Sequence, residues 1–312
     1  MAAQQLVILG GTGFVGSHLV PRLAADGHRI VLLSRNREQH RELGVLPQVR
    51  VRSADVYNDE VLRRELEGAD AVINLIGILN PSGKHSFQRA HVELTRRLIA
   101  ACHASSVGRL HQMSSLKAGQ GLSQYLKTRG EAESLVKASG LDWTIYQPSV
   151  IFGEGDGLVS RFAVLLRRMP MLPLARAKAR MAPTYVGDVA EAIARCVGSA
   201  KLGQRRSLEL YGPEVLTLGE IVHRIRDTAG LRTPIIPLHD SLGQLQAQVA
   251  GLLPGTPFSL DNFRSLRTDS VGKTDGYAAL GIVPQPFTPW LPRLLGGSLL
   301  QKRLNEARAF RR

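Results

Sequence analysis

The chain has 312 residues, 44% of them apolar, and a formal net charge of +14. This composition is that of a folded globular protein, and the length suffices for one large α/β domain with a smaller appendage. The two cysteines lie far apart, which argues against a disulfide framework and suits a reducing compartment. The histidines show no metal-ligand spacing, so no metal is expected.

No stretch approaches the roughly 18 apolar residues of a membrane span. The first apolar run begins too early for a signal peptide, so we expect a cytoplasmic protein. The excess of basic residues favours anionic partners such as nucleotides, acidic proteins or anionic lipid. Nucleic acid is not expected, because the sequence contains no DNA- or RNA-binding motif.

The first apolar run, residues 6–9, is followed by the sequence GGTGFVG at residues 10–16 and an amphipathic segment at 14–25. A strand, a glycine turn and a helix start in this order predict a dinucleotide-binding site. The first glycine permits the turn, the second lets the backbone approach a pyrophosphate, and the third lets helix and strand pack closely. The helix start supplies amide donors to the phosphates. The residues expected at the pyrophosphate are Gly10, Gly13, Phe14, Val15 and Gly16.

The second predicted strand, residues 29–33, ends in the sequence SRNR. An acidic residue here would accept a hydrogen bond from the adenosine ribose 2′-hydroxyl and favour NAD. A hydroxyl and guanidinium groups can instead bind a 2′-phosphate. We therefore predict NADP(H), with NAD(H) less favoured, held by Ser34, Arg35 and Arg37; the alternative is a solvated basic loop.

Further strands are predicted at residues 49–51, 71–76, 109–113 and 144–146, with helices at 87–104 and 124–139. This alternation predicts an α/β fold: a Rossmann-type, doubly wound parallel sheet that binds its ligand at the carboxyl ends of the strands. Asp55, Val56, Asn74 and Gly77 follow the third and fourth strands and are expected on the adenosine side of the cofactor; a turn aspartate is the alternative for Asp55. Pro148 and Val150 are expected beside the nicotinamide.

Beyond this region the alternation loosens. We expect a dinucleotide-binding domain over residues 1–155, to which later segments return, and mainly a smaller α/β lid and a basic tail over 156–312. Asp188 is expected to cap the helix that follows it. The lid is expected to contain a strand at 207–211 and helices at 217–229 and 242–253.

Ser115 follows the fifth strand, and Tyr125 lies one helical turn before Arg129. A neighbouring cation favours the phenolate form of a tyrosine, which can then exchange a proton with a carbonyl or carbinol oxygen. A serine hydroxyl can hold the same oxygen. We predict Ser115, Tyr125 and Arg129 as the catalytic residues.

The sequence resembles the extended or atypical short-chain dehydrogenase/reductases. The motifs that carry this resemblance are those described above, together with ADV, AVINLIGI, MSS, YLKTRGEAE and PSVIFG. In that family a Ser, a Tyr and a Lys four residues after the Tyr form the catalytic set, and the Lys holds the nicotinamide ribose. The resemblance implies that Tyr125 and Arg129 also contact the cofactor. Arg129 stands where the family has Lys, and Lys127 lies two residues earlier. A guanidinium does not relay protons, so an active and an inactive site both stay open.

The C-terminal half resembles the NADPH-binding accessory subunits of respiratory complex I and their bacterial epimerase/dehydratase-like relatives. The stretches that carry this resemblance are GPEVLTLGEIVHRIRDTAG and FSLDNFRSLRTDSVG, and His91 in the N-terminal half adds to it. In the mitochondrial subunit the nucleotide is a structural cofactor. The resemblance implies tight NADPH binding in a membrane-associated or respiratory setting. The alternative is an active NADP(H)-dependent carbonyl or quinone-like reductase, with a sugar-nucleotide epimerase less favoured.

Two basic amphipathic stretches suit a peripheral position on the inner face of a membrane, or docking on a respiratory-complex partner. The first is a helix over 158–169, and the second is the apolar stretch 290–295 followed by the basic tail 302–312. The alternative is that the helix packs in the core and the tail is a solvated end. The apolar face of the helix contains Leu158, Phe162, Leu165, Leu166 and Met169.

Overall fold

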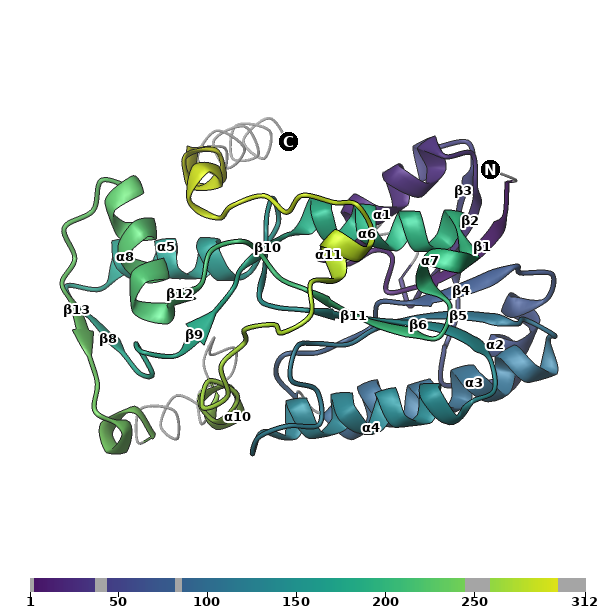
Figure 1. Ribbon diagram of the computed structural model, residues 1–312, viewed down its shortest axis with the longest axis horizontal. Coiled ribbons are helices and arrows are strands. Elements are labelled where there is room, and N and C mark those ends of the chain that lie inside the picture. Colours follow the sequence, from purple (N-terminus) through teal and green to yellow (C-terminus); the bar gives the residue numbers. More distant parts are fainter. Residues whose placement is uncertain (1–2, 37–43, 82–85, 245–258, 297–312) are drawn as a thin grey trace, which may run out of the picture.

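The computed structural model describes residues 3–36, 44–81, 86–244 and 259–296. Its central feature is a seven-stranded sheet in the order β11-β6-β5-β4-β1-β2-β3 (Figure 1). All neighbouring strands in it are parallel, which confirms the predicted Rossmann-type fold. The strands are β1 (Gln5–Leu9), β2 (Arg29–Ser34), β3 (Val49–Ser53), β4 (Ala71–Asn74), β5 (Arg109–Met113), β6 (Asp142–Pro148) and β11 (Arg206–Leu210).

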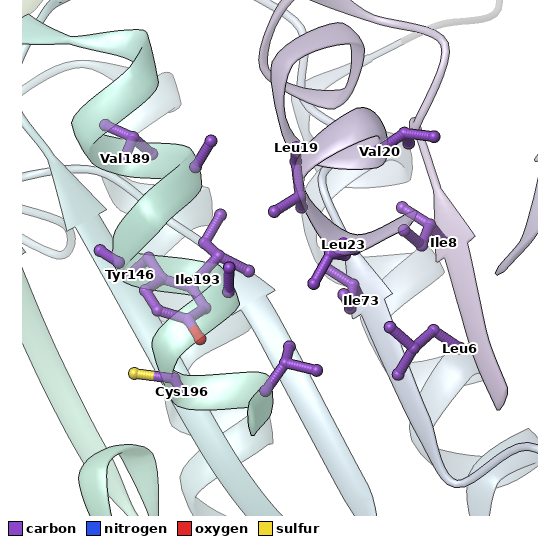
Figure 2. Packing of buried hydrophobic residues seen from close by; sticks show 14 of the residues in the cluster. Leu6, Ile8, Leu19, Val20, Leu23, Ile73, Tyr146, Val189, Ile193 and Cys196 are labelled. Atoms are coloured by element: carbon purple, nitrogen blue, oxygen red, sulfur yellow. The ribbon is translucent and has the colours of Figure 1, made fainter. Parts of the chain in front are cut away.

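Helices cover both faces of this sheet. Leu6 and Ile8 of β1 pack toward α1 (Phe14–Ala25) and α6 (Val186–Gly198), whereas Val7 and Leu9 belong to the core on the opposite face. Figure 2 shows side chains of α1 and α6 gathering over β1 and β4. The other face is covered by α2 (Asp59–Leu66), α3 (Leu94–Ala104) and α4 (Gln124–Ala138).

Two elements near the cleft differ from the expected bounds. Strand β4 ends at Asn74, because the Asn74 side-chain oxygen accepts a hydrogen bond from the Ile76 amide at 3.1 Å and turns the chain out of the sheet. The helix expected from residue 87 begins with a π-helical segment, η2 (Gln88–Glu93), before α3. His91 lies in this segment, with its side chain directed at α4.

The C-terminal half has a hydrophobic core of its own, to the left of the sheet in Figure 1. Helices α5 (Leu158–Arg168) and α8 (Leu218–Thr228) pack in it with short strand pairs. Strand β11 leaves this half and joins the edge of the large sheet beside β6. The short pairs are β7 (Ile151–Phe152) with β10 (Thr184–Tyr185), β8 (Leu172–Leu174) with β13 (Ile235–Pro237), and β9 (Arg180–Met181) with β12 (Leu216–Thr217). Short helices also occur in the described part of the chain, among them α7 (Ala200–Gly203), α10 (Leu260–Ser265), α11 (Gly276–Ala279) and η3 (Thr288–Trp290).

Residues 259–275, which we call the bridging segment, connect the two halves. Asp261 accepts hydrogen bonds from the Gln124 and Tyr125 amides at the start of α4, at 2.7 and 3.0 Å. Farther along, Ser270 exchanges backbone hydrogen bonds with Arg180 and Ala182 of the C-terminal half. The bridging segment is thus hydrogen-bonded both to the start of α4 and to the C-terminal half.

Some expectations fall outside the described residues. Arg37, the tail 302–312 and most of the helix expected at 242–253 lie there, although the first residues of that helix, up to 244, are helical. Among the described residues, no helix is both long and apolar enough to cross a membrane.

Candidate functional site

A cleft of about 1100 Å³ follows the carboxyl ends of the sheet strands and continues between the sheet and the C-terminal half. It brings together most of the residues predicted from the sequence. Those that line it are Gly10, Gly13, Phe14, Val15, Gly16, Ser34, Arg35, Val56, Gly77, Ser115, Tyr125, Arg129, Pro148 and Val150.

The glycine turn at one end of the cleft leaves no room for side chains at Gly10 and Gly16. Gly10 has a φ of +74°, and a β-carbon there would lie 3.0 Å from the Ile76 amide nitrogen. A β-carbon on Gly16 would lie 2.2 Å from the Gly11 carbonyl oxygen, so Gly16 lets the helix pack on the turn itself. No side chain caps the N-terminus of α1, and its first turn contains no acidic residue. The amides there are oriented to bind an anion.

The end of β2 is also part of the cleft. The Ser34 hydroxyl is buried and accepts a hydrogen bond from the Asn36 amide at 3.3 Å, while Arg35 is exposed at the rim. Among the described residues that line the cleft there is no aspartate or glutamate. The basic residues that line it are Arg35, Lys117, Arg129, Arg161 and Arg180. A cleft with only positive side-chain charges attracts phosphate groups.

Two predicted residues do not line the cleft in the described part of the chain. Asp55 is exposed, and its carboxylate accepts a hydrogen bond from the Tyr57 amide at 3.0 Å, as a turn aspartate does. Asn74 is buried, and its side-chain amide donates to the Gln112 side-chain oxygen at 3.1 Å. Both side chains fix the backbone of loops that approach the cleft.

The two serines after β5 have different surroundings. The Ser114 hydroxyl donates to the buried Glu133 carboxylate at 2.6 Å, and Gln147 donates to the same oxygen at 2.7 Å. The Ser115 hydroxyl is buried, lines the cleft, and has no hydrogen-bond partner among the described residues. Since buried hydroxyls are normally paired, Ser115 is the serine available to a ligand.

Arg129 is the most buried cation of the cleft, with 5% of the residue exposed. Its Nη1 atom donates to the Met113 carbonyl oxygen at 2.8 Å, and its Cζ atom lies 5.5 Å from the centre of the Tyr125 ring. Its Nε–H has no partner, and no carboxylate of a described residue pairs with its guanidinium. Lys127, by contrast, is exposed and does not line the cleft. Arg129 therefore has hydrogen-bonding capacity left for a cofactor or substrate.

His91 orients Tyr125 from the other side, a role that the sequence analysis did not assign. Its Nδ1 atom lies 2.9 Å from the Thr128 hydroxyl, which itself donates a hydrogen bond to the Gln124 carbonyl oxygen. The His91 and Tyr125 rings meet edge-on, with 5.6 Å between their centres. Burial, and to a lesser extent the charge of Arg129, lower the pKa of His91 to about 2. The imidazole is therefore neutral at physiological pH.

The two apolar stretches considered for membrane contact are divided between the cleft and the hydrophobic core. Leu158, Phe162, Leu165 and Met169 line the cleft, and Leu166 is buried in the C-terminal core. In the second stretch, Leu291 is fully buried, Leu295 is 5% exposed, and Trp290 stacks on Tyr185. The alternative of core packing thus holds for Leu166, Leu291 and Leu295, whereas the other four side chains of the helix face the cleft.

A parallel sheet with the order 3-2-1-4-5-6 and a glycine turn after its first strand defines a dinucleotide-binding Rossmann protein. The sequence model of a family described as NAD(P)H-binding matches residues 10–198. The chain belongs to this family, within the extended short-chain dehydrogenase/reductases, and its cofactor is a nicotinamide nucleotide.

The curated relatives include a respiratory subunit and a reductase. The chain is 27% identical to the mitochondrial NADH dehydrogenase (ubiquinone) 1 alpha subcomplex subunit 9 of Arabidopsis thaliana over 280 residues, which cover 85% of this chain and 70% of that protein. It is 32% identical to the ceramide reductase of Caulobacter vibrioides over 189 residues, 59% of this chain and 58% of that protein. The chain thus spans less than two thirds of the ceramide reductase.

The solved structures show the same fold. An NADPH-dependent quinone oxidoreductase of Escherichia coli, complexed with NADPH, is similar with a TM-score of 0.74 and 18% sequence identity. The match covers 93% of this chain and 99% of that one.

Proposed function

We propose that this protein holds NADPH tightly in the cleft and acts as an NADPH-binding protein of the complex I accessory-subunit type. The observation that carries this proposal is the combination of an uncapped glycine turn with a cleft lining that has basic but no acidic described residues. NADPH differs from NADH by an added phosphate, so a lining whose described charged side chains are all basic favours NADPH.

In the proposed arrangement the pyrophosphate lies at the start of α1, and the 2′-phosphate lies at Ser34 and Arg35. Val56 borders the adenine, and Pro148 and Val150 border the nicotinamide. The remaining predicted contacts come from the loop after β4 and from α4. They are Gly77, which lies against Arg129, together with Tyr125 and Arg129 themselves.

Slow release of NADPH is expected because the bridging segment spans the cleft. Asn262, Thr268 and Ser270 line the cleft, and Asn262 donates to the Asn80 side chain beyond β4 at 3.0 Å. Ser149 after β6 donates to the Ser270 carbonyl at 2.9 Å. In the proposed arrangement the bridging segment covers the bound nucleotide, so these hydrogen bonds must break before the nucleotide can leave. We assign nucleotide binding mainly to residues 1–155 and the lid mainly to 156–312.

The respiratory setting is supported by the similarity to the Arabidopsis subunit over 85% of the chain. In such a setting the partner of this protein would be a membrane-associated assembly. The net charge of +14 favours a peripheral position on the anionic inner face of a membrane.

The coenzyme preference is tested by titrating the purified protein with NADPH and NADH, using nucleotide fluorescence, in the wild type and in Arg35→Asp. We expect Arg35→Asp to weaken NADPH binding about tenfold or more and to change NADH binding little, because attraction of the 2′-phosphate becomes repulsion. Arg50→Asp is the matched control, since Arg50 is exposed on β3 and does not line the cleft. An unchanged preference in Arg35→Asp would contradict the 2′-phosphate assignment.

A second candidate function, reduction of a carbonyl compound, is favoured by the unpartnered Ser115 hydroxyl. Bound NADPH supplies a hydride in such chemistry. Ser115 would hold the substrate oxygen, Tyr125 would give it a proton, and Arg129, which stays protonated, would stabilise the resulting phenolate. Tyr125 would regain its proton from water, because Arg129 does not release one.

A further inference from the structure

The cleft is longer than its nucleotide-binding end. Beyond Ser115 and Val150 it continues along α5, which lies to the left of the sheet in Figure 1. One face of α5 and the residue after it line this part of the cleft with the side chains of Leu158, Phe162, Leu165 and Met169. Their spacing places them in a single stripe along the helix.

The walls around this stripe are mostly apolar. The apolar residues that complete this end of the cleft are Leu172, Pro173, Leu174, Ala175, Ala179, Met181, Leu218 and Leu266. The uncharged polar side chains at this end come from the bridging segment, at Asn262, Ser265, Thr268 and Ser270, and two positive charges come from Arg161 and Arg180. We call this end of the cleft, from Leu158 onward, the apolar chamber. Because most of the lining is apolar, a ligand gains mainly from burying hydrocarbon here.

We propose that the apolar chamber binds the single long hydrocarbon chain of a lipid-like ligand whose polar end lies at Ser115. This inference rests on the proposed function, because NADPH is assigned to the glycine-turn end of the same cleft. The Ser115 hydroxyl has no partner among the described residues and can hold one polar group, whereas the stripe on α5 offers only apolar contact.

The length of the stripe sets the length of the chain. Leu158 and Met169 are eleven positions apart, which corresponds to about 16 Å along a helix. An extended carbon chain advances roughly 1.2 Å per bond, so about fourteen carbons span the stripe. Each methylene buried against such walls strengthens binding about fourfold. Affinity is therefore expected to rise steadily with chain length and then level off.

The test uses the full chain and a dansyl-labelled fatty acid, displaced by unbranched primary alcohols of six to sixteen carbons. In the NADPH-loaded protein we expect binding to tighten with each added carbon up to about fourteen and to change little beyond. Leu165→Lys places a charge on the stripe and should weaken dodecanol binding about tenfold or more. Val164→Lys is the matched control, because Val164 is on the same helix but does not line the cleft; it should bind dodecanol like the wild type.

Chain-length independence in the wild type would overturn the inference, and so would equal dodecanol affinities for Leu165→Lys and Val164→Lys. NADPH fluorescence in the same samples separates this inference from the proposed function. If NADPH binds and the alcohols show no chain-length dependence, the inference alone fails. If NADPH does not bind, the proposed function fails, and the same alcohol series on the nucleotide-free protein still decides whether the chamber takes a hydrocarbon chain.

Discussion

Arg129 extends from α4 across the end of β5 and lies directly against Gly77. A β-carbon on Gly77 would be 2.0 Å from the Arg129 Nη2 atom, while Nη1 donates to the Met113 carbonyl oxygen at 2.8 Å. The absence of a side chain at position 77 thus leaves room for the guanidinium at the cleft. An arginine four residues after Tyr125 can occupy the cleft here, although it is longer and more branched than the lysine typical of the family.

Adding a methyl group at this contact should displace Arg129. We expect Gly77→Ala to fold, because the clash is with the far end of a flexible side chain, but to bind NADPH about tenfold more weakly through loss of a charge-assisted hydrogen bond. Fluorescence titration measures the affinity. Gly108→Ala is the control, since nothing lies within 4 Å of a β-carbon there. Equal affinities in the two variants would show that Arg129 does not hold the nucleotide.

If the protein is a reductase, Tyr125 carries its chemistry. Tyr125→Phe should abolish NADPH oxidation in the presence of a carbonyl substrate and leave NADPH affinity within about threefold, because removing one hydroxyl affects proton transfer more than binding. Ser115→Ala should lower kcat about a hundredfold through loss of the hydrogen bond to the reacting oxygen. Full activity in Tyr125→Phe would remove the tyrosine from the reaction.

The bridging segment should stabilise the start of α4. Asp261→Ala removes the acceptor of the Gln124 and Tyr125 amides, and the loss of such a cap costs about 1 kcal/mol. We expect Tm to fall by about 1.5 °C in thermal unfolding. Asp227→Ala is the comparison variant, since its ion pair with the adjacent Arg226 lies on the surface and should contribute little. A Tm loss no larger than in Asp227→Ala would contradict the capping role.

Burial of His91 should make the fold sensitive to acid. Its pKa is about 2 in the folded protein, below the ordinary 6.5, so the unfolded chain takes up the proton first and stability falls as the pH drops below 6.5. Between pH 7.5 and 5.0 this residue should account for about 2 kcal/mol of the loss in unfolding free energy.

Urea unfolding without nucleotide at the two pH values, in the wild type and in His91→Gln, measures that contribution. The variant should lose about 2 kcal/mol less stability on acidification. Part of the acid sensitivity should remain, because burial also lowers the pKa of His111, to about 3. Identical losses in both proteins would mean that His91 is already neutral or equally charged in both states.

The nucleotide-binding half of the fold could be predicted because its causes are local. The glycine turn, the apolar runs and the helical periodicities lie within short stretches, and each specifies its own element. The predicted strands at residues 109–113 and 207–211 were correct to within one residue at each end. The order of the strands in the sheet was not predicted, because no single stretch contains it.

The remainder depends on contacts between distant residues. Asp188 was expected to cap a helix, but α6 begins at Val186, and the Asp188 carboxylate instead accepts a hydrogen bond from the Gln285 amide at 2.7 Å. Lys117 and Arg161 line the cleft without any local motif that indicates it. The apolar face of α5 was visible in the sequence, but not that a cleft lies against it. Tertiary packing alone decides such roles.

The central claim, tight retention of NADPH, is tested most directly by the exchange rate of the nucleotide. Mass spectrometry of the purified protein identifies any retained nucleotide, and isotope-labelled NADPH then measures how fast it is replaced. We predict that the purified protein contains NADPH and that exchange takes hours, because the hydrogen bonds of the bridging segment across the cleft must break before the nucleotide can leave. Exchange within seconds, or retention of NADH instead, would contradict the account and would favour a reductase whose coenzyme comes and goes with each turnover.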